Sequence, residues 1–289
     1  MQISKQLHAG NGFFPRRAKP AAGARLFLAA LALLAATATG AFAADGDFFS
    51  PDWQLTGTFG LSDSSGNYGT PVNTDVFLGL STLSLASGDF KFNASIPYMR
   101  ISGRGLVVFD ASGNPIVINR RTSLPPDVRT GWGDVNFSAS YTIPPSILDD
   151  FEVRLTGVTK VPTGSARRRL STGAYDFGAS VDVSRQFGVW GPFVTVGYLD
   201  LGKPAGFTFY NTTSVSAGTS LMLRDNLVAV ASYEYDSADS PLVPAGHQLF
   251  GSLSWICNDR ITLTGYGSAG LSAGSPDFGA GFLISYGLK

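Results

Sequence analysis

The last thirteen residues of the chain, DFGAGFLISYGLK (277–289), alternate between apolar side chains and small or polar ones. Phe278 and Phe282 share one side of an extended segment, and Gly279 and Gly281 share the other. A period of two is typical of a β-strand with two different faces. In a soluble sandwich the apolar face packs in a core, whereas in a membrane barrel it faces lipid and the polar face lines a lumen.

The same alternation recurs along most of the chain. It is clear in 53–61, 90–98, 134–143, 151–161, 175–183 and 227–236, weaker in 248–255 and 260–267, and of ambiguous facing in 75–86, 193–201 and 207–223. With the terminal segment, these predict about twelve strands of ~10–12 residues, close to the ~9–11 residues of a tilted membrane strand. Strands of soluble proteins are shorter, at about 5–6 residues.

The connections between these segments alternate in length. The short ones are 87–89, 144–150, 186–191, 224–226 and 258–259, and the longer ones are 63–73, 101–131, 162–174, 237–245 and 271–276, with 202–206 as a brief exception. In an antiparallel meander this alternation places every short turn at the same end. Short periplasmic turns opposite longer outer loops are typical of outer-membrane barrels.

The N-terminus predicts a removable export signal. Residues 1–25 carry five basic side chains and no acidic ones, and the apolar run 26–43 ends in an Ala-Phe-Ala cleavage pattern. We therefore expect a signal peptide over 1–43, in preference to a membrane anchor, and a mature chain over 44–289. Since five of the 21 basic residues and none of the 21 acidic residues leave, the mature net charge is −5. This charge argues against nucleic-acid binding.

The mature chain has no run near the ~18 apolar residues of a membrane helix, so it would span a membrane only as a closed barrel. Trp53, Trp132, Trp190 and Trp255 fall at the ends of the expected strands, where an aromatic girdle lies. We therefore predict an all-β fold: a transmembrane antiparallel β-barrel of about 12 strands, in an up-and-down meander, in the bacterial outer membrane. A secreted β-sandwich is the alternative.

Few side chains offer catalytic chemistry. His247 is the one histidine of the mature chain, and no nucleophile or metalloprotease motif surrounds it, so a loop histidine is favoured over a general base. Cys257 is the sole cysteine, which excludes an internal disulfide, and it is interpreted as a small apolar strand residue. Because no cluster has metal-ligand spacing, we expect no catalytic site, cofactor or metal.

Charged residues on the polar strand faces are the candidates for lining a lumen. They are Lys91, Asp134, Glu152, Arg154, Lys160, Asp176, Asp182, Glu234 and Asp236. The neighbouring strands 151–161 and 175–183 are expected to pair Arg154 or Lys160 with Asp176 or Asp182. Such pairs either brace a narrow interior or set the polarity of a pore, and both interpretations stay open.

Two of the longer loops stand out. Loop 101–131 holds two apolar runs around 110–114, which predicts a hairpin that either extends the wall outward or folds in as a constriction. A basic patch is expected in the outer loops, formed by Arg120, Arg121, Arg129, Arg167, Arg168 and Arg169. It is interpreted as a contact for anionic lipopolysaccharide or, alternatively, as an entry patch for anionic solutes.

Three short motifs within 131–202 resemble one known family. They are Gly131-Trp132-Gly133-Asp134 at a strand start, Lys160-Val161-Pro162-Thr163-Gly164 at a strand end, and Gly173-Ala174-Tyr175-Asp176-Phe177 at the next strand start. This stretch, about a quarter of the chain, is similar to the outer-membrane "meta-pathway of phenol degradation" transporter family. The resemblance implies an outer-membrane barrel that passes aromatic or other hydrophobic solutes, and it brings no catalytic residues.

These observations predict an outer-membrane channel for passive uptake of small molecules, and no enzyme. The alternative is a non-conducting structural or adhesion barrel whose lumen is filled with side chains; a barrel enzyme is less favoured. The expected partners are outer-membrane lipid, lipopolysaccharide, a small solute and, during insertion, the barrel-assembly machinery. Known barrels commonly end on an aromatic residue, so Lys289, appended after Leu288, departs from the usual assembly signal.

Overall fold

The computed structural model describes residues 53–67, 73–103, 106–111, 113, 115–119, 127–144 and 147–288. The predicted signal peptide at 1–43, as well as Arg120, Arg121 and Lys289, lies outside these residues. Within the described ranges, no helix has the length and apolar character needed to cross a membrane.

The described residues form fifteen strands. They are β1 (Gln54–Gly66), β2 (Thr74–Ser87), β3 (Phe90–Gly103), β4 (Leu106–Phe109), β5 (Pro115–Asn119), β6 (Asp127–Trp132), β7 (Val135–Ile143), β8 (Phe151–Val161), β9 (Asp176–Arg185), β10 (Trp190–Asp200), β11 (Thr212–Arg224), β12 (Leu227–Asp236), β13 (Gly246–Ile256), β14 (Ile261–Gly270) and β15 (Phe278–Gly287). All strand pairs are antiparallel, and β4 and β5 form a separate two-stranded sheet.

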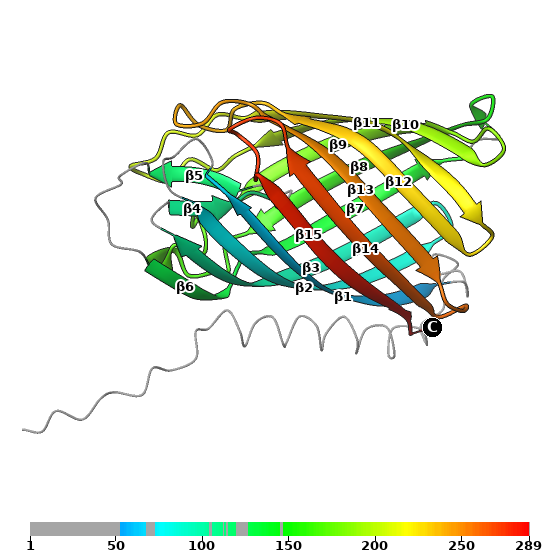
Figure 1. Cartoon of the computed structure of the whole chain (residues 1–289), viewed down its shortest axis with the longest axis horizontal. Helices are drawn as coiled ribbons and strands as arrows, with labels where there is room; N and C mark the ends of the chain where they lie inside the picture. Colours follow the sequence, from blue (N-terminus) through cyan, green and yellow to red (C-terminus); the bar gives the residue numbers. More distant parts are fainter. Residues whose placement is uncertain are drawn as a thin grey trace, which may run out of the picture. The chain divides into compact units, whose positions relative to one another are not determined.

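The other thirteen strands close into one barrel (Figure 1). Neighbours in the chain are neighbours in the wall, and β15 pairs with β1, which closes the ring. Since β6 and β7 follow each other end to end along β3, the wall has twelve strand positions. Closure leaves the wall without an unpaired edge. The predicted twelve-stranded meander is confirmed.

The two ends of the barrel differ in their connections. β2–β3, β9–β10, β11–β12 and β13–β14 are joined by short turns at one end, together with the 144–150 connection. The described connections 162–175, 201–211, 237–245 and 271–277 lie at the other end, where β1 and β3 also end and β2 and β6 begin; we call it the long-loop end (left in Figure 1). β1 begins and β15 ends at the short-turn end, where Thr56 is opposite Gly287. The predicted turn asymmetry is therefore present.

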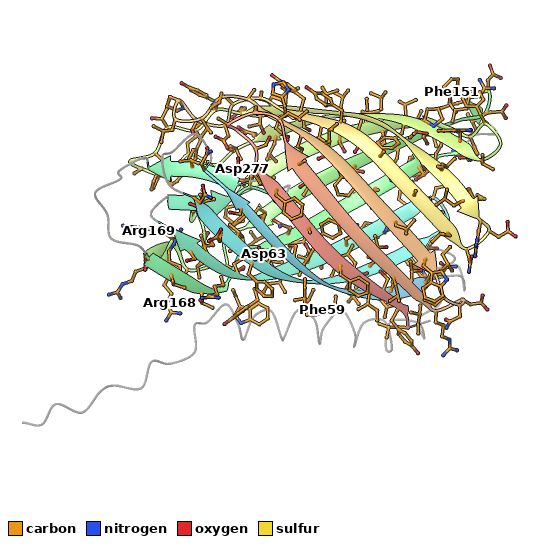
Figure 2. All side chains as sticks on the ribbon, in the orientation of Figure 1. Phe59, Asp63, Phe151, Arg168, Arg169 and Asp277 are labelled. Carbon is orange, nitrogen blue, oxygen red and sulfur yellow. The ribbon has the colours of Figure 1, made fainter. Side chains whose placement is uncertain are left out.

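The outward face of the wall is apolar and the inward face carries hydroxyl groups. Phe59 on β1 and Phe282 on β15 are about half exposed on the outside, where Figure 2 shows Phe59 and Phe151 pointing away from the barrel. Inside, Thr58 is hydrogen-bonded to Ser285 across the β1–β15 seam. Similar inward hydroxyl pairs link β7 to β8 and β13 to β14. An apolar exterior around a polar interior is the arrangement of a membrane barrel.

A β-bulge joins β6 to β7. Tyr98 is opposite Trp132 and Ser95 is opposite Asn136, so two residues of β3 face three residues of the other strand. Pro97 lies opposite the bulge, and its carbonyl accepts a hydrogen bond from the Gly133 amide (2.8 Å). The bulge reverses the in–out alternation between β6 and β7. The sequence pattern therefore does not show that part of the predicted loop 101–131 is a wall strand. Residues 101–103 and 127–132 belong to the wall, and Trp132, at the end of β6, lies inside the wall position that β6 and β7 share rather than at the rim of the barrel.

The glycine-rich inward face of β15 makes room for an aromatic ring. A Cβ atom at Gly281 would collide with the ring of Tyr266 on β14 and lie 2.8 Å from the Leu61 carbonyl oxygen, whereas one at Gly265 would meet nothing within 4 Å. We expect Gly281→Ala to lower the free energy of unfolding by about 1–3 kcal/mol through overpacking. Urea denaturation of the refolded barrel would measure this. Equal midpoints for Gly281→Ala and the control Gly265→Ala would contradict the prediction.

Candidate functional site

The β4–β5 hairpin lies inside the long-loop end of the barrel. Val107, Val108, Ile116 and Val117, two residues from each strand, are at most 1 % exposed. Burial on both faces of a two-stranded hairpin requires surrounding elements on both sides. Of the two alternatives left open by the sequence, the hairpin therefore folds in and narrows the mouth.

Three apolar clusters hold the hairpin. The first joins Val108, Ala111 and Ile116 to Leu199 at the end of β10 and to Leu201 and Phe209 beyond it. The second joins Val107 and Val117 to Val243 in the 237–245 loop. The third joins Val76, Met99, Ile101 and Leu170, with Phe109 of the hairpin packed against them. Since each fully buried aliphatic side chain stabilises by about 1.5–3 kcal/mol, these clusters favour the inserted position.

Cations from the wall supply hydrogen bonds to the hairpin backbone. Arg129 donates from Nη1 to the carbonyls of Arg169 (3.2 Å) and, at a longer 3.5 Å, of Val107. Lys160 donates from Nζ to the carbonyl of Phe109 (3.2 Å). A two-stranded sheet leaves carbonyls on its outer edges without partners in the sheet, and buried carbonyls need donors. Arg129 on β6 and Lys160 on β8 thus anchor the outer edge of β4 to one side of the mouth, because β6 and β7 share a wall position and β8 pairs with β7.

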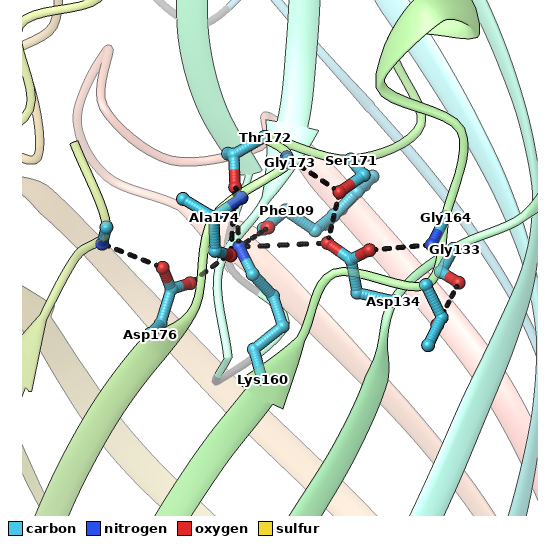
Figure 3. A network of polar contacts seen from close by, with 12 residues as sticks. Phe109, Gly133, Asp134, Lys160, Gly164, Ser171, Thr172, Gly173, Ala174 and Asp176 are labelled. Carbon is cyan, nitrogen blue, oxygen red and sulfur yellow. Dashed lines mark hydrogen bonds and ion pairs between the residues drawn. The ribbon is translucent and has the colours of Figure 1, made fainter. Parts of the chain in front are cut away.

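Lys160 is the centre of a buried ionic cluster (Figure 3). Its Nζ lies 2.6 Å from Asp176 Oδ2 and 3.8 Å from Asp134 Oδ2, and it donates to Thr172 Oγ1 (3.1 Å) as well as to Phe109. The Lys160 and Asp176 side chains are 1 % exposed. A buried charge is tolerated only when it is paired and hydrogen-bonded, and these contacts meet that requirement.

The two carboxylates of the cluster also bind the long loops. Asp134 accepts hydrogen bonds from the Gly164 amide (2.9 Å) and the Ser171 hydroxyl (2.8 Å). Asp176 accepts one from the Gly202 amide (3.0 Å). One lysine and two aspartates therefore connect the hairpin and the wall to loops 162–175 and 201–211.

The three motifs singled out in the sequence meet at this cluster. Each contributes one charged residue, namely Asp134, Lys160 or Asp176. Their glycines allow the close approach: a Cβ at Gly133 would lie 2.6 Å from Met99 Cε, and one at Gly164 would lie 2.9 Å from the Gly133 carbonyl carbon. The charged motif residues thus form a buried structural anchor in the mouth.

The remaining lumen candidates lie on the inward face, apart from this cluster. Arg154 is directly opposite Asp182 in register, but its guanidinium pairs with Glu152 on its own strand at 2.8 Å. Asp182 instead accepts the hydroxyl of Thr195 (2.6 Å). The pairing of Lys160 with Asp176 is as expected, and an Arg154–Asp182 pair is not formed.

Nearer the mouth, on the opposite side of the interior, Glu234 accepts a hydrogen bond from Gln248 (2.6 Å), and Asp236 follows it on the inward face of β12. Lys91 lies on the inward face at the short-turn end of β3 and is exposed there.

The predicted basic patch is smaller than expected. Arg167 and Arg168, in a 3-10 helix at Ala166–Arg168, are exposed together with Arg169. The prediction that Arg129 belongs to this patch is wrong. Arg129 lies on β6, is only 6 % exposed, and points inward to the hairpin rather than outward from a loop. Arg120 and Arg121 lie outside the described residues.

Two cavities remain around the hairpin. The lower cavity, of about 430 Å³, lies below the hairpin tip and combines apolar groups such as Leu80 and Met99 with the amides of Asn93 and Asn136. The upper cavity, of about 200 Å³, lies beside the hairpin. Both are lined by Ser62, Leu78, Phe109 and Gly113, so they adjoin each other at the tip. Sequence reasoning missed these four residues, because none of them carries charge or a recognisable motif.

The one mature histidine lies apart from the candidate site. His247 contacts the phenol of Tyr233 on the outward face of the wall, away from both cavities. In the described ranges, no three His, Cys, Asp or Glu side chains are grouped so that they could hold a metal ion.

No family model matches the sequence, and neither does any curated protein. Among solved structures, the chain is similar to the NanC porin, with 12 % identity, 81 % of this chain and 99 % of that chain covered, and a TM-score of 0.48. It is also similar to the NalP autotransporter translocator domain from Neisseria meningitidis, with 11 % identity, 92 % of this chain and 98 % of that chain covered, and a TM-score of 0.45. A third similar structure is the Pseudomonas putida toluene transporter TodX, with 12 % identity, 83 % of this chain and 90 % of that chain covered, and a TM-score of 0.38. These distant likenesses assign no function.

Proposed function

We propose that the protein is an outer-membrane channel for passive uptake of small molecules. The observation that carries this proposal is the pair of cavities that adjoin each other at the hairpin tip inside a closed, hydroxyl-lined barrel. A constriction with polar walls selects solutes by size and by the groups that line it. The inserted hairpin supplies such a constriction without filling the interior.

The solute class that the lower cavity favours is a small molecule with an apolar face, such as an aromatic compound. Leu80, Met99 and Tyr266 offer apolar contact, and Asn93 and Asn136 offer hydrogen bonds to one polar group. A cavity of about 430 Å³ is within the ~300–1,000 Å³ usual for small-molecule sites. The resemblance to the phenol meta-pathway family supports the same class.

The location follows from the export signal proposed at 1–43 and from the apolar exterior of the mature barrel, 44–289. Arg167, Arg168 and Arg169 are exposed at the long-loop end, where they suit the anionic groups of lipopolysaccharide. Insertion would use the barrel-assembly machinery, although the chain ends in Leu288 and Lys289 where known barrels commonly end on an aromatic residue. We propose no enzymatic activity: His247 lines neither cavity, and among the described residues no three His, Cys, Asp or Glu side chains are grouped so that they could hold a metal ion.

Planar-bilayer recording and liposome swelling test the channel. We expect a steady current from purified barrel and faster swelling with small aromatic solutes than with sugars of similar size. The alternative is a non-conducting structural or adhesion barrel, which the buried hairpin favours because it fills part of the mouth. Absence of both current and solute flux would overturn the channel in favour of that alternative.

A further inference from the structure

The hairpin closes the mouth unevenly. It is fastened to β3, β8 and β10 by Met99, Lys160 and Leu199, through apolar packing and the Lys160 hydrogen bond. Toward β1, β12 and β13, by contrast, the upper cavity separates part of the hairpin from the wall. This cavity is also bordered by Pro244 of loop 237–245 and Pro276 of loop 271–277, so it lies between the hairpin and the outer loops.

The charged groups of the mouth are distributed just as unevenly. Asp236 and Asp239 are the only charged side chains among the described residues that line the upper cavity. The Oδ1 atom of Asp239 is buried and has no hydrogen-bond partner in the described structure. None of the described cations lines the upper cavity: Lys160 borders the lower cavity, and Arg129 with Arg167–Arg169 borders a separate surface hollow that shares no residue with the upper cavity.

We propose that solutes pass the hairpin through the upper cavity, and that Asp236 and Asp239 make this passage selective against anions. The permeant class is therefore small uncharged or cationic molecules. Fixed carboxylates repel anions strongly where low-dielectric walls confine the path. The inference rests on the proposed channel function and deepens it. It also separates the passage from the arginines of the rim, which the sequence left as a possible entry for anionic solutes.

Ion selectivity in a salt gradient tests the two aspartates. We expect the wild-type reversal potential to show that cations permeate better than anions, and the double variant Asp236→Asn/Asp239→Asn to lose most of this preference. Asp63→Asn is the matched control, because Asp63 lies on β1 between Ser62 and Ser64 but is exposed on the outward face, opposite Phe77 (Figure 2). Its selectivity should equal that of the wild type.

The pH dependence gives a second readout. Burial, with a smaller contribution from the nearby charge of Asp236, raises the pKa of Asp239, in loop 237–245, to about 6. The carboxyl is therefore charged above that pH and neutral below it, so cation preference should fall as the pH drops through about 6. Ser240 and the backbone amide of Tyr210 also contact Asp239. His247 faces outward, away from this cavity, so His247→Gln should leave the effect unchanged.

Thiol labelling tests the route itself. In a Cys257→Ser background, Ser62→Cys lies where the two cavities adjoin each other, whereas Asp63→Cys lies on the opposite face of the same strand. We expect a cationic methanethiosulfonate reagent to reduce current through Ser62→Cys and not through Asp63→Cys.

The outcomes separate the two proposals. Current that is equally carried by cations and anions, or selectivity that survives the double aspartate change, would overturn the inference and leave the channel standing. Absence of block at Ser62→Cys would overturn the route. Absence of any current from the wild-type barrel would overturn the channel function, and the route with it.

Discussion

Replacing residues 104–126 by an Asn-Gly turn is expected to raise the single-channel conductance several-fold. Gly103 at the end of β3 is the register partner of Asp127 at the start of β6, so a two-residue turn can join these strands without changing the wall. The replacement removes the hairpin and thereby merges the upper and lower cavities into one wide mouth. Because conductance increases with the cross-section of the narrowest point, this variant should show the largest functional change.

The deletion also removes Arg104, Arg120 and Arg121, so its control is the full-length Arg104→Ser/Arg120→Ser/Arg121→Ser variant. That control keeps the hairpin and should conduct like the wild type. Cation selectivity should weaken in the deletion, since the aspartates then face a wider opening. An unchanged conductance in a correctly folded deletion variant would show that the narrowest point lies elsewhere, for example in the hydroxyl-lined middle of the barrel.

Much of the wall could be predicted from the sequence because alternation reports directly on facing. In β8 and β9, charged or polar residues alternate with apolar residues. This alternation predicts that Glu152, Lys160 and Asp176 lie on the inner face. In β6 the pattern failed. The bulge before Val135 shifts the phase of the alternation by one residue, so the alternation does not identify Arg129 as a wall residue.

The contents of the mouth could not be predicted in the same way. The two apolar runs of the hairpin would suit a hairpin that faces lipid outside the wall or one that packs in a core inside it. Only the clusters with Leu199, Val243 and Met99 show that the hairpin lies inside. Asp239 lies in a loop without periodicity, so nothing in the sequence connects it with Asp236. The meeting of three motifs at Lys160 depends on the register of β7, β8 and β9, which short motifs do not encode.

Lys160→Met is expected to be the most destabilising single substitution in the mouth, at about 3–5 kcal/mol of unfolding free energy. It leaves Asp134 and Asp176 buried without their cation and removes the donor to the Phe109 carbonyl. Lys91→Met is the matched control, because Lys91 is exposed inside the lumen. Urea denaturation in lipid vesicles would compare them, and equal destabilisation by both would contradict a special role for Lys160.

A triple variant separates the charge effect from packing. In Asp134→Asn/Lys160→Met/Asp176→Asn the buried charges are removed together, while the asparagine carbonyls can still accept from Gly164 and Gly202. Replacing a complete buried ionic group is often nearly neutral, whereas breaking one is costly, so the triple variant should regain most of the lost stability. If it regains stability but conducts more than the wild type, the cluster's contribution to function is to hold the hairpin through Phe109. If its conductance is unchanged, the apolar clusters hold the hairpin without Lys160.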